Sequence, residues 1–317
     1  MDWIFDRRSG ARVSDRLELA GGPVVVLENE RLRAVCLAGK GADIVSLFNK
    51  DAACECLSQP YPTFPFRPGE APALGREFGK YMTVWPEMFP VASAWGDYFG
   101  QAQPFHGEAR LLAWRHEIIE DSPQRVSVRL SARMQLSPFR LTRTMTLDAD
   151  SPVLALDERV ENLANQPLPV LWGHHPTFGP PFLDETCRVQ LPGGDYIDGD
   201  DSMLQLAPPG SGVHNMFYRL NLSSGRCGLF SHKRGFGVGL RFDHQLFRVI
   251  WIWQGLNQNS GAPNFDTRYA CAVEPVTGLP KQHAQSDRTP PILVHPETPL
   301  TTRLDVFLYT DQRDLED

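Results

Sequence analysis

Val126-Ser-Val-Arg-Leu-Ser-Ala-Arg-Met134 alternates strictly between apolar and polar side chains. Successive side chains of an extended strand point to opposite faces, so this segment predicts a strand with one face in a core and one in water. Residues 140–147 repeat the alternation around three threonines, and residues 153–160 continue as a further strand. Asp148-Ala-Asp-Ser-Pro152 supplies the turn between those two segments. The centre of the chain therefore predicts an antiparallel sheet.

Further short strands are predicted on both sides of this centre. They cover residues 24–37, as a pair around the Glu28-Asn-Glu30 turn, and residues 44–48, 236–242, 247–253, 269–273 and 304–309. The prolines and aromatic residues of segment 58–80 predict an ordered loop, and residues 192–212 are rich in turn formers. No amphipathic helix of three turns and no repeat of fixed period is present. The pattern predicts an all-β fold, a large antiparallel β-sandwich that takes up residues 1–317 as a single domain.

Composition and charge argue against several classes of partner. The net charge is −7 without a basic cluster, so neither nucleic acid nor an anionic membrane is expected as a partner. The N-terminal segment lacks the apolar core of a signal peptide, and no later run is long enough to span a bilayer. The six cysteines form no C-x-x-C pair, and Cys36 and Cys271 lie in apolar segments that predict buried free thiols. We expect a cytoplasmic protein, and the sequence leaves the oligomeric state open.

Two adjacent histidines stand out in Val170-Leu-Trp-Gly-His-His-Pro-Thr-Phe178. Pro176 restricts His175 to extended geometry. Side chains of neighbouring residues then point to opposite faces, so only one of His174 and His175 can face a given pocket. A purely structural alternative is a strand end with one solvated and one packed histidine.

Glu274 is the most informative single residue, because it ends an apolar strand directly before Pro275. A buried carboxylate is costly unless it is paired or used, and a carboxylate with an imidazole is the minimum for general acid–base catalysis near neutral pH. His106 is a further candidate, because Gly107 beside it permits close approach of a ligand to the backbone. The alternatives are a solvated glutamate at a strand end and an ordinary loop histidine.

These segments resemble, in the same order, segments of the aldose 1-epimerases, the galactose mutarotase family. His175-Pro-Thr-Phe178 is similar to the family's His-x-Tyr-Phe segment, although Thr177 stands where tyrosine is usual. Val273-Glu-Pro275 with Thr277-Gly278 resembles its catalytic Glu-Pro segment, and Phe105-His-Gly107 resembles its first histidine motif. Residues 28–32, 39–44 and 46–47 also resemble the N-terminal sequence of the family. The resemblance implies a galactose mutarotase-like supersandwich that binds a small sugar in a cleft on one sheet face.

The resemblance also implies a reaction, the interconversion of the α and β anomers of a hexose without a metal or an organic cofactor. Glu274 would take the proton of the C1 hydroxyl while His175 donates one to the ring oxygen, and the ring would open, rotate about C1–C2 and close again. His106 would hold sugar hydroxyls or help to polarise the ring oxygen. Since both reacting oxygens share one carbon, we expect the Glu274 and His175 groups to lie roughly 4–8 Å apart in a cleft that His106 also lines.

The remaining predicted substrate-binding residues are His174, Arg76, Asp243 and Trp172. Arg76, with Arg67 as the alternative, is a candidate by position for the family's arginine, and Asp243, with Asp266 as the alternative, for its aspartate. Trp172 is a candidate to stack on the apolar face of a sugar, as are Trp85 and Trp95, although tryptophans in a sandwich are more often part of the core.

Three other functions stay open at this point. A hexose-6-phosphate 1-epimerase would need an arginine cluster, for which Arg67, Arg76 and Arg110 are candidates. A metal-dependent sugar isomerase would use His106, His174, His175 and Glu274 as ligands, although adjacent histidines on an extended chain are poor joint ligands. A non-catalytic carbohydrate-binding or regulatory protein could have the same fold.

Overall fold

The computed structural model of the chain describes residues 4–19, 22–58, 84–94, 96–257 and 268–315. In these residues every pairing between strands is antiparallel. Helix is confined there to short 3-10 turns, namely η1 (Ala109–Leu111), η2 (Asp201–Leu204), η3 (Ser286–Arg288) and η4 (Gln312–Leu315). The predicted all-β class is therefore confirmed.

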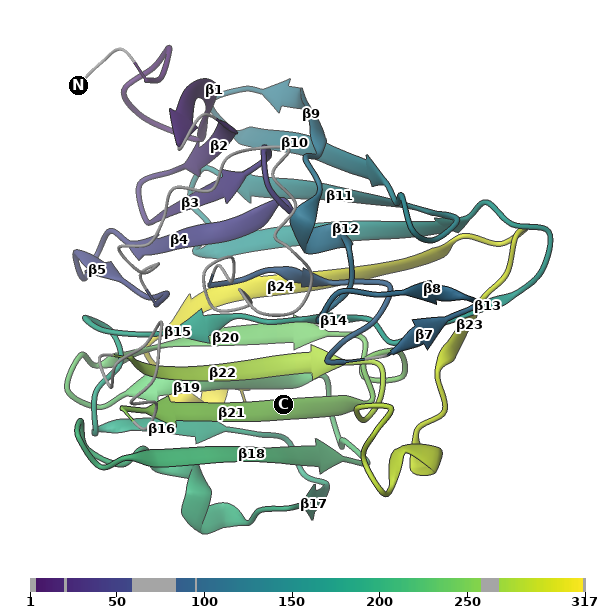
Figure 1. The fold of residues 1–317 in the computed structure, drawn as a ribbon. Coiled ribbons are helices and arrows are strands. Elements are labelled where there is room, and N and C mark those ends of the chain that lie inside the picture. Colours follow the sequence, from purple (N-terminus) through teal and green to yellow (C-terminus); the bar gives the residue numbers. More distant parts are fainter. Residues whose placement is uncertain (1–3, 20–21, 59–83, 95, 258–267, 316–317) are drawn as a thin grey trace.

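Three sheets make up most of the structure (Figure 1). The eight-stranded sheet has the order β16 (Cys187–Gln190), β19 (Arg226–Ser231), β20 (Phe236–Phe242), β24 (Leu300–Tyr309), β12 (Val153–Asn162), β11 (Phe139–Asp148), β10 (Arg125–Arg133) and β9 (Arg115–Asp121). The five-stranded sheet has the order β1 (Arg12–Leu19), β2 (Gly22–Glu28), β3 (Leu32–Leu37), β4 (Asp43–Asn49) and β5 (Cys54–Glu55). The seven-stranded sheet has the order β17 (Asp195–Ile197), β18 (Val213–Leu220), β21 (Val249–Leu256), β22 (Tyr269–Val276), β14 (Gly173–His174) and β6 (Glu87–Met88), and β15 (Thr177–Phe178) also pairs with β22. Two small pairs complete the list, β13 (Leu168–Val170) with β23 (Ile292–Val294) and β7 (Asp97–Tyr98) with β8 (Gln101–Ala102).

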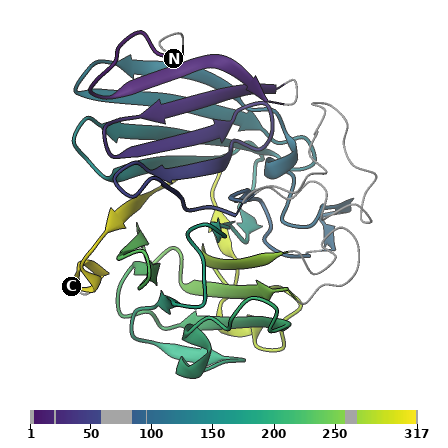
Figure 2. The ribbon, with the colours of Figure 1, turned by 90° about the vertical axis from the view of Figure 1, so that its left-hand side faces the viewer.

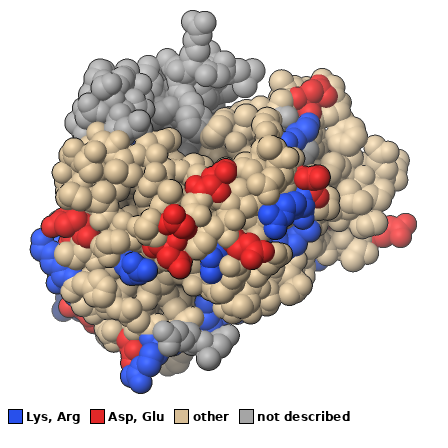
Figure 3. All heavy atoms as spheres, turned by 90° about the horizontal axis from the view of Figure 1, so that it is seen from below, with Lys and Arg blue, Asp and Glu red and all other residues tan. Residues whose placement is uncertain are grey.

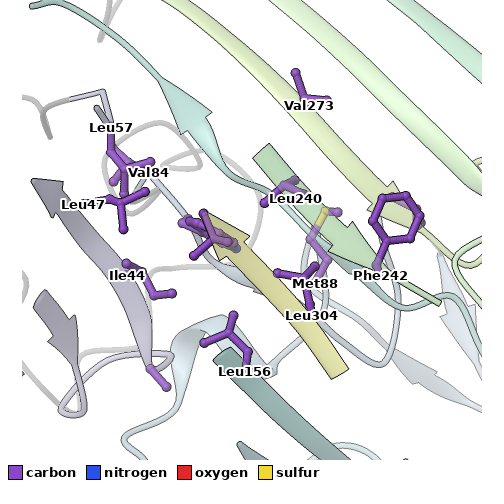
Figure 4. Packing of buried hydrophobic residues seen from close by; sticks show 14 of the residues in the cluster. Ile44, Leu47, Leu57, Val84, Met88, Leu156, Leu240, Phe242, Val273 and Leu304 are labelled. Carbon is purple, nitrogen blue, oxygen red and sulfur yellow. The ribbon is translucent and has the colours of Figure 1, made fainter. Parts of the chain in front are cut away.

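The eight-stranded sheet runs the length of the molecule and forms one layer of a sandwich (Figure 1). The five-stranded sheet lies against the end that carries β9 to β12, and the seven-stranded sheet lies against the other end (Figures 1 and 2). Apolar side chains from both layers meet in one buried core, among them Leu47 of β4, Leu156 of β12, Leu240 of β20 and Val273 of β22 (Figure 4). The predicted antiparallel β-sandwich is confirmed.

Most strands lie where the alternation of side chains predicts them. β10, β11 and β12 lie at the predicted positions, except that β10 ends one residue before Met134, and Val128 is opposite Met145, which is opposite Leu156. The expectation that strands resume only at residue 236 is wrong, because β18 and β19 precede that point. β18 reads Val-His-Asn-Met-Phe-Tyr-Arg-Leu, and its polar first half lies at a partly exposed end of the strand, so it lacks the apolar alternation of a strand with a continuous buried face. The predicted loop at residues 58–80 lies outside the described residues except for its first residue.

All six cysteines are buried free thiols, as predicted for Cys36 and Cys271. Burial raises the pKa of Cys36 to about 12, which keeps this thiol protonated and unreactive at neutral pH. On the face drawn in Figure 3, acidic and basic side chains are interspersed rather than segregated. The described residues include no helix that is both long enough and apolar enough to cross a membrane.

A cluster of charged side chains lies between the two layers, where alternation would otherwise place apolar residues. Arg143 of β11 is directly opposite Glu158 of β12, and its Nε donates to Glu158 Oε1 over 2.7 Å. Its Nη2 donates to Glu87 of β6, in the facing sheet. His174 of β14 completes the cluster, with Nε2 3.0 Å from Glu158 Oε2 and Nδ1 3.7 Å from Glu87 Oε2. We call these four fully enclosed residues the ionic quartet.

The ionic quartet is balanced when all four groups are charged, with two positive groups facing two negative ones. Although burial opposes the charged form of His174, the carboxylates of Glu158 and Glu87 raise its pKa. Burial likewise opposes ionisation of Glu158, yet His174 and Arg143 lower its pKa. Burial raises the pKa of Glu87, with the charge of Glu158 acting in the same direction. The charges of His174 and Glu158 are thus tolerated in the interior because of their neighbours, whereas burial outweighs the neighbours at Glu87.

Replacement of Arg143 by methionine keeps an unbranched side chain but leaves two buried carboxylates without their guanidinium. We expect the Arg143→Met variant to lose about 3–5 kcal/mol of unfolding free energy at pH 7, measured by urea denaturation. Arg140 on the same strand is the matched control, because its guanidinium is half-exposed and its pairing with Glu161 is long, at 3.4 Å. Arg140→Met should change stability by no more than about 0.5 kcal/mol. Similar small losses in both variants would contradict the importance assigned to the quartet.

Candidate active site

Glu274 lies on β22, and its side chain points to the face of the sheet opposite to that of Val273. Val273 packs in the core between the layers (Figure 4), so alternation directs the Glu274 carboxylate away from this core. The residue is nevertheless only 1% exposed. Its Oε2 atom has no hydrogen-bond partner among the described residues. Burial raises the pKa of Glu274 well above its ordinary value. A buried carboxylate oxygen without a partner calls for a functional explanation.

His175 approaches Glu274 from the segment between β14 and β15. Its Nε2 lies 3.6 Å from Glu274 Oε1, and its Nδ1 lies 2.9 Å from the hydroxyl oxygen of Thr177. Thr177 is itself held in place because it pairs with Ala272 of β22. Burial lowers the pKa of His175 to about 4, and the positive charges of Arg268 and Arg110 add to this shift. Thr177 thus fixes the orientation of the imidazole.

The imidazole of His175 and the carboxyl of Glu274 are 3.6 Å apart. This distance is shorter than the predicted separation of roughly 4–8 Å. That interval assumed two groups separated by the edge of a sugar, whereas here they are in direct contact. The two pKa shifts favour the uncharged form of both groups, because burial penalises a charge on either one. Burial therefore favours a protonated Glu274 beside a neutral His175.

His106 joins the pair from a turn that the backbone holds firmly. His106 and Gly107 both adopt positive φ, at 63° and 76°, and a Cβ at Gly107 would lie 2.2 Å from the carbonyl oxygen of Phe89. Glycine is therefore required at position 107. The backbone N–H of Ser93 donates to His106 Nδ1 over 2.9 Å, which leaves Nε2 as the protonated nitrogen. Burial lowers the pKa of His106, so the ring is a neutral donor. Its centroid lies 5.2 Å from that of His175.

His174 and Trp172 do not share this face, which corrects the expectation that they bind substrate. As the alternation of an extended chain requires, His174 points away from His175 and into the ionic quartet. Trp172 is fully buried, and its indole N–H donates to Glu87. Neither side chain is accessible to a ligand on the face of Glu274.

The ionic quartet contains residue types that often bind metal ions, but its surroundings do not favour a bound cation. One ligand atom each from Glu87, Glu158 and His174 lie within 4.8 Å of one another. Arg143 already donates to both carboxylates, so a cation there would meet a fixed positive charge. The three residues are fully enclosed as well. In the metal-isomerase alternative His174 would bind together with His175, and the two point to opposite faces.

The other predicted substrate-binding residues lie elsewhere or outside the described residues. Arg76 and its alternative Arg67 are outside them, as are Asp266 and Trp95. Asp243 lies in the exposed turn after β20, where its carboxylate accepts a hydrogen bond from the backbone N–H of Gln245 over 2.9 Å. Among the described residues no contact joins Asp243 to Glu274, His175 or His106.

Aromatic residues of β21, which were not predicted to be part of the site, lie on the face of Glu274. Trp251 is directly opposite Glu274, and Trp253 is opposite Ala272, two positions along the same strand. The guanidinium of Arg268 lies over the Trp253 ring, 4.9 Å from its centroid. The spacing of the two tryptophans in the sequence shows that they share a face. Which face they share depends on the register between β21 and β22, and no local pattern specifies that register.

Comparisons with known proteins agree with this architecture. A candidate aldose 1-epimerase from Klebsiella pneumoniae superposes with a TM-score of 0.75 at 13% identity, covering 96% of this chain and 84% of that one. A galactose mutarotase-like protein from Clostridium acetobutylicum has a TM-score of 0.71 at 14% identity, covering 95% of this chain and 99% of the other. A galactose mutarotase-like protein from Lactobacillus casei has a TM-score of 0.61 at 18% identity, with coverages of 90% and 100%.

At such low identities these likenesses establish the fold, and they confirm the resemblance to galactose mutarotase-like proteins at that level. No curated protein matches the chain. The sequence of residues 97–306, which is most of the chain, matches a family described as a domain of unknown function, DUF4432. The chain has the fold of the galactose mutarotase-like proteins and belongs to the DUF4432 family.

Proposed function

We propose that the chain is an aldose 1-epimerase that interconverts the α and β anomers of a hexose. The observation that carries the proposal is the contact between two buried groups, His175 Nε2 and Glu274 Oε1, which lie 3.6 Å apart. Burial shifts their pKa values in opposite directions, down for His175 and up for Glu274. His106 lies against the same imidazole. These three residues are far apart in the sequence, and the all-antiparallel fold brings them to one place. The mutarotase-like fold of the solved structures supports the same reaction class.

The pair supplies one movable proton, which is what ring opening requires. In the free protein burial keeps this proton on Glu274 and leaves His175 neutral. A bound sugar would donate hydroxyl hydrogen bonds to the unpaired Glu274 Oε2, and hydrogen bonds to a carboxylate favour its charged form. The proton would then move to His175, and the adjacent carboxylate would stabilise the imidazolium.

Ring opening follows from this arrangement. Glu274 accepts the proton of the C1 hydroxyl while His175 donates one to the ring oxygen, the C1–O5 bond breaks, and a C1 carbonyl forms. After rotation about C1–C2, the C1 oxygen takes a proton back from Glu274, His175 recovers the proton of the C5 hydroxyl, and the ring closes to the other anomer. Thr177 keeps the imidazole directed at Glu274. The Nε2–H of His106 is a donor for the ring oxygen or a neighbouring hydroxyl.

The direct test is anomer exchange measured by NMR on a panel of free and phosphorylated aldoses, with bovine serum albumin as a control for non-specific catalysis. We expect at least one aldose to exchange faster in the presence of the chain. Activity should survive exhaustive dialysis against EDTA, because general acid–base chemistry suffices. Absence of exchange with every aldose would refute the proposed function. Loss to EDTA with recovery on adding a divalent metal would favour the metal isomerase instead.

Variants of the adjacent histidines separate the site from the ionic quartet. Glu274→Gln and His175→Asn should each lower kcat by roughly 10²–10⁴, the usual contribution of a positioned proton-transfer group. His174→Asn is the matched control on the neighbouring residue. It should destabilise the fold, since it leaves Glu158 and Glu87 less compensated, but change kcat of the folded protein far less. Equal losses of kcat in both histidine variants would contradict the assignment of the catalytic face.

Burial of Glu274 predicts a pH-dependent stability that requires no substrate. Its pKa in the folded chain is raised well above the ordinary 4.5, so the folded chain binds more protons than the unfolded one between those two values. Stability therefore falls as pH rises through that window. Glu274→Gln removes this loss, so its advantage in urea midpoint over the wild type should be larger at pH 8 than at pH 4. Glu297→Gln, at an exposed position, should show no such change. A Glu274→Gln advantage independent of pH would rule out the buried, protonated carboxyl.

A further inference from the structure

Tyr218 lies two strands away from Glu274 on the same face of the seven-stranded sheet. Tyr218 of β18 is directly opposite Trp251 of β21, and Trp251 is directly opposite Glu274 of β22. Directly opposed residues place their side chains on one face. Neighbouring strands are about 4.8 Å apart, so the two backbones are separated by roughly 10 Å. His175 lies beside Glu274 on its other side, so the order across the face is His175, Glu274, Trp251 and Tyr218.

Two fixed rings hold the phenol of Tyr218. The Trp251 ring meets it edge to face with centroids 5.9 Å apart, and the Trp251 indole N–H donates to the carbonyl of Gly278 over 2.9 Å. On the other side the His283 ring lies 5.2 Å away, also edge to face. Both nitrogens of His283 are engaged, Nε2 with Asp198 Oδ2 at 2.9 Å and Nδ1 with the backbone N–H of Gln285 at 3.1 Å. His283 therefore supports the Tyr218 ring and does not itself offer a ligand a free nitrogen.

The hydroxyl of Tyr218 is the part of this arrangement that lacks a partner. The residue is 6% exposed, and its hydroxyl, which is not fully enclosed, forms no hydrogen bond with any of the described residues. A tyrosine hydroxyl without a protein partner is free to exchange a hydrogen bond to water for one to a ligand. Burial, followed by the carboxylates of Asp198 and Glu274, raises the pKa of Tyr218 to about 12. The phenol is consequently a protonated donor at neutral pH that lies within electrostatic reach of the catalytic carboxylate.

We propose that the Tyr218 hydroxyl binds the hydroxyl group on C2 of the sugar and so selects for aldoses that carry it. This inference rests on the proposed function, in which His175 meets the ring oxygen and Glu274 meets the C1 oxygen. Around the anomeric centre the ring oxygen, the C1 oxygen and the C2 oxygen follow in that order. His175, Glu274 and Tyr218 follow one another in the same order across the face of the sheet, and Trp251 lies between Glu274 and Tyr218.

The test combines one variant with one missing hydroxyl group. We would measure kcat/KM for anomer exchange with the wild type and with Tyr218→Phe, on the preferred aldose and on its 2-deoxy and 6-deoxy analogues. On the parent sugar Tyr218→Phe should lose about tenfold, the contribution of one hydrogen bond. On the 2-deoxy sugar the variant should match the wild type within about twofold, because the shared bond is already absent. On the 6-deoxy sugar the full tenfold loss should remain.

Tyr196→Phe is the matched control. Tyr196 lies in the same sheet but on the opposite face, since its neighbour Ile197 is the residue opposite Tyr218. Its hydroxyl already has a partner, Asp201, at 2.6 Å. This variant should leave all three sugars unaffected, and urea denaturation should show that both phenylalanine variants are folded.

Each other outcome has a defined meaning. A Tyr218→Phe loss that persists on the 2-deoxy sugar, or that disappears on the 6-deoxy sugar, overturns the C2 assignment while the epimerase activity stands. If the wild type exchanges no aldose, the proposed function fails, and the same comparison is made on affinity through the fluorescence of the adjacent Trp251. Equal affinity of wild type and variant for the parent sugar, or binding of no sugar at all, then overturns the assignment of Tyr218.

Discussion

An extended chain must direct neighbouring side chains to opposite faces, and the dipeptide His174-His175 shows what depends on this constraint. One imidazole enters the interior between the two layers and meets Glu158. The other lies on the far face of the same sheet and meets Glu274. The same rule separates Val273, in the core, from Glu274. Two adjacent strands thus divide structural and chemical roles residue by residue, with Pro176 preventing a helix that would place both histidines differently.

The electrostatics of the two faces differ because their charges are compensated differently. Inside, Arg143 and His174 face two carboxylates, and the energetic cost of removing each charge from water is offset by its neighbours. On the other face Glu274 and His175 have little compensation, and burial favours the neutral form of both. A protonated carboxyl in contact with a neutral imidazole is a pair between which a proton can pass when a ligand changes their surroundings. The interior cluster is suited to holding the sheets together, whereas the outer pair is suited to moving a proton.

The sequence was sufficient for the fold class and for much of the site, and its failures have identifiable physical causes. Alternation located β10 to β12, and the segments around His106, His175 and Glu274 were recognisable without coordinates. β18 was missed because His214 and Asn215 interrupt its apolar pattern. Tyr218, which lies on this strand, was missed with it. Trp172 was a candidate to stack on the apolar face of a sugar, but its burial beside Glu87 depends on how two sheets pack. Pairing register and sheet packing are long-range properties, so residues that depend on them were not predictable from local patterns.

The ionic quartet has a consequence for how this chain can diverge. Its members come from four strands in two sheets, Glu87 and His174 from one layer and Arg143 and Glu158 from the other. A chain that exchanged one of them alone would leave an unbalanced charge in the interior, whereas four apolar residues of similar volume could fill the space without such a cost. Descendants of this protein should therefore either retain all four residues or replace them as a set. His174 would then vary together with Arg143, which is 31 positions earlier in the sequence (174 − 143).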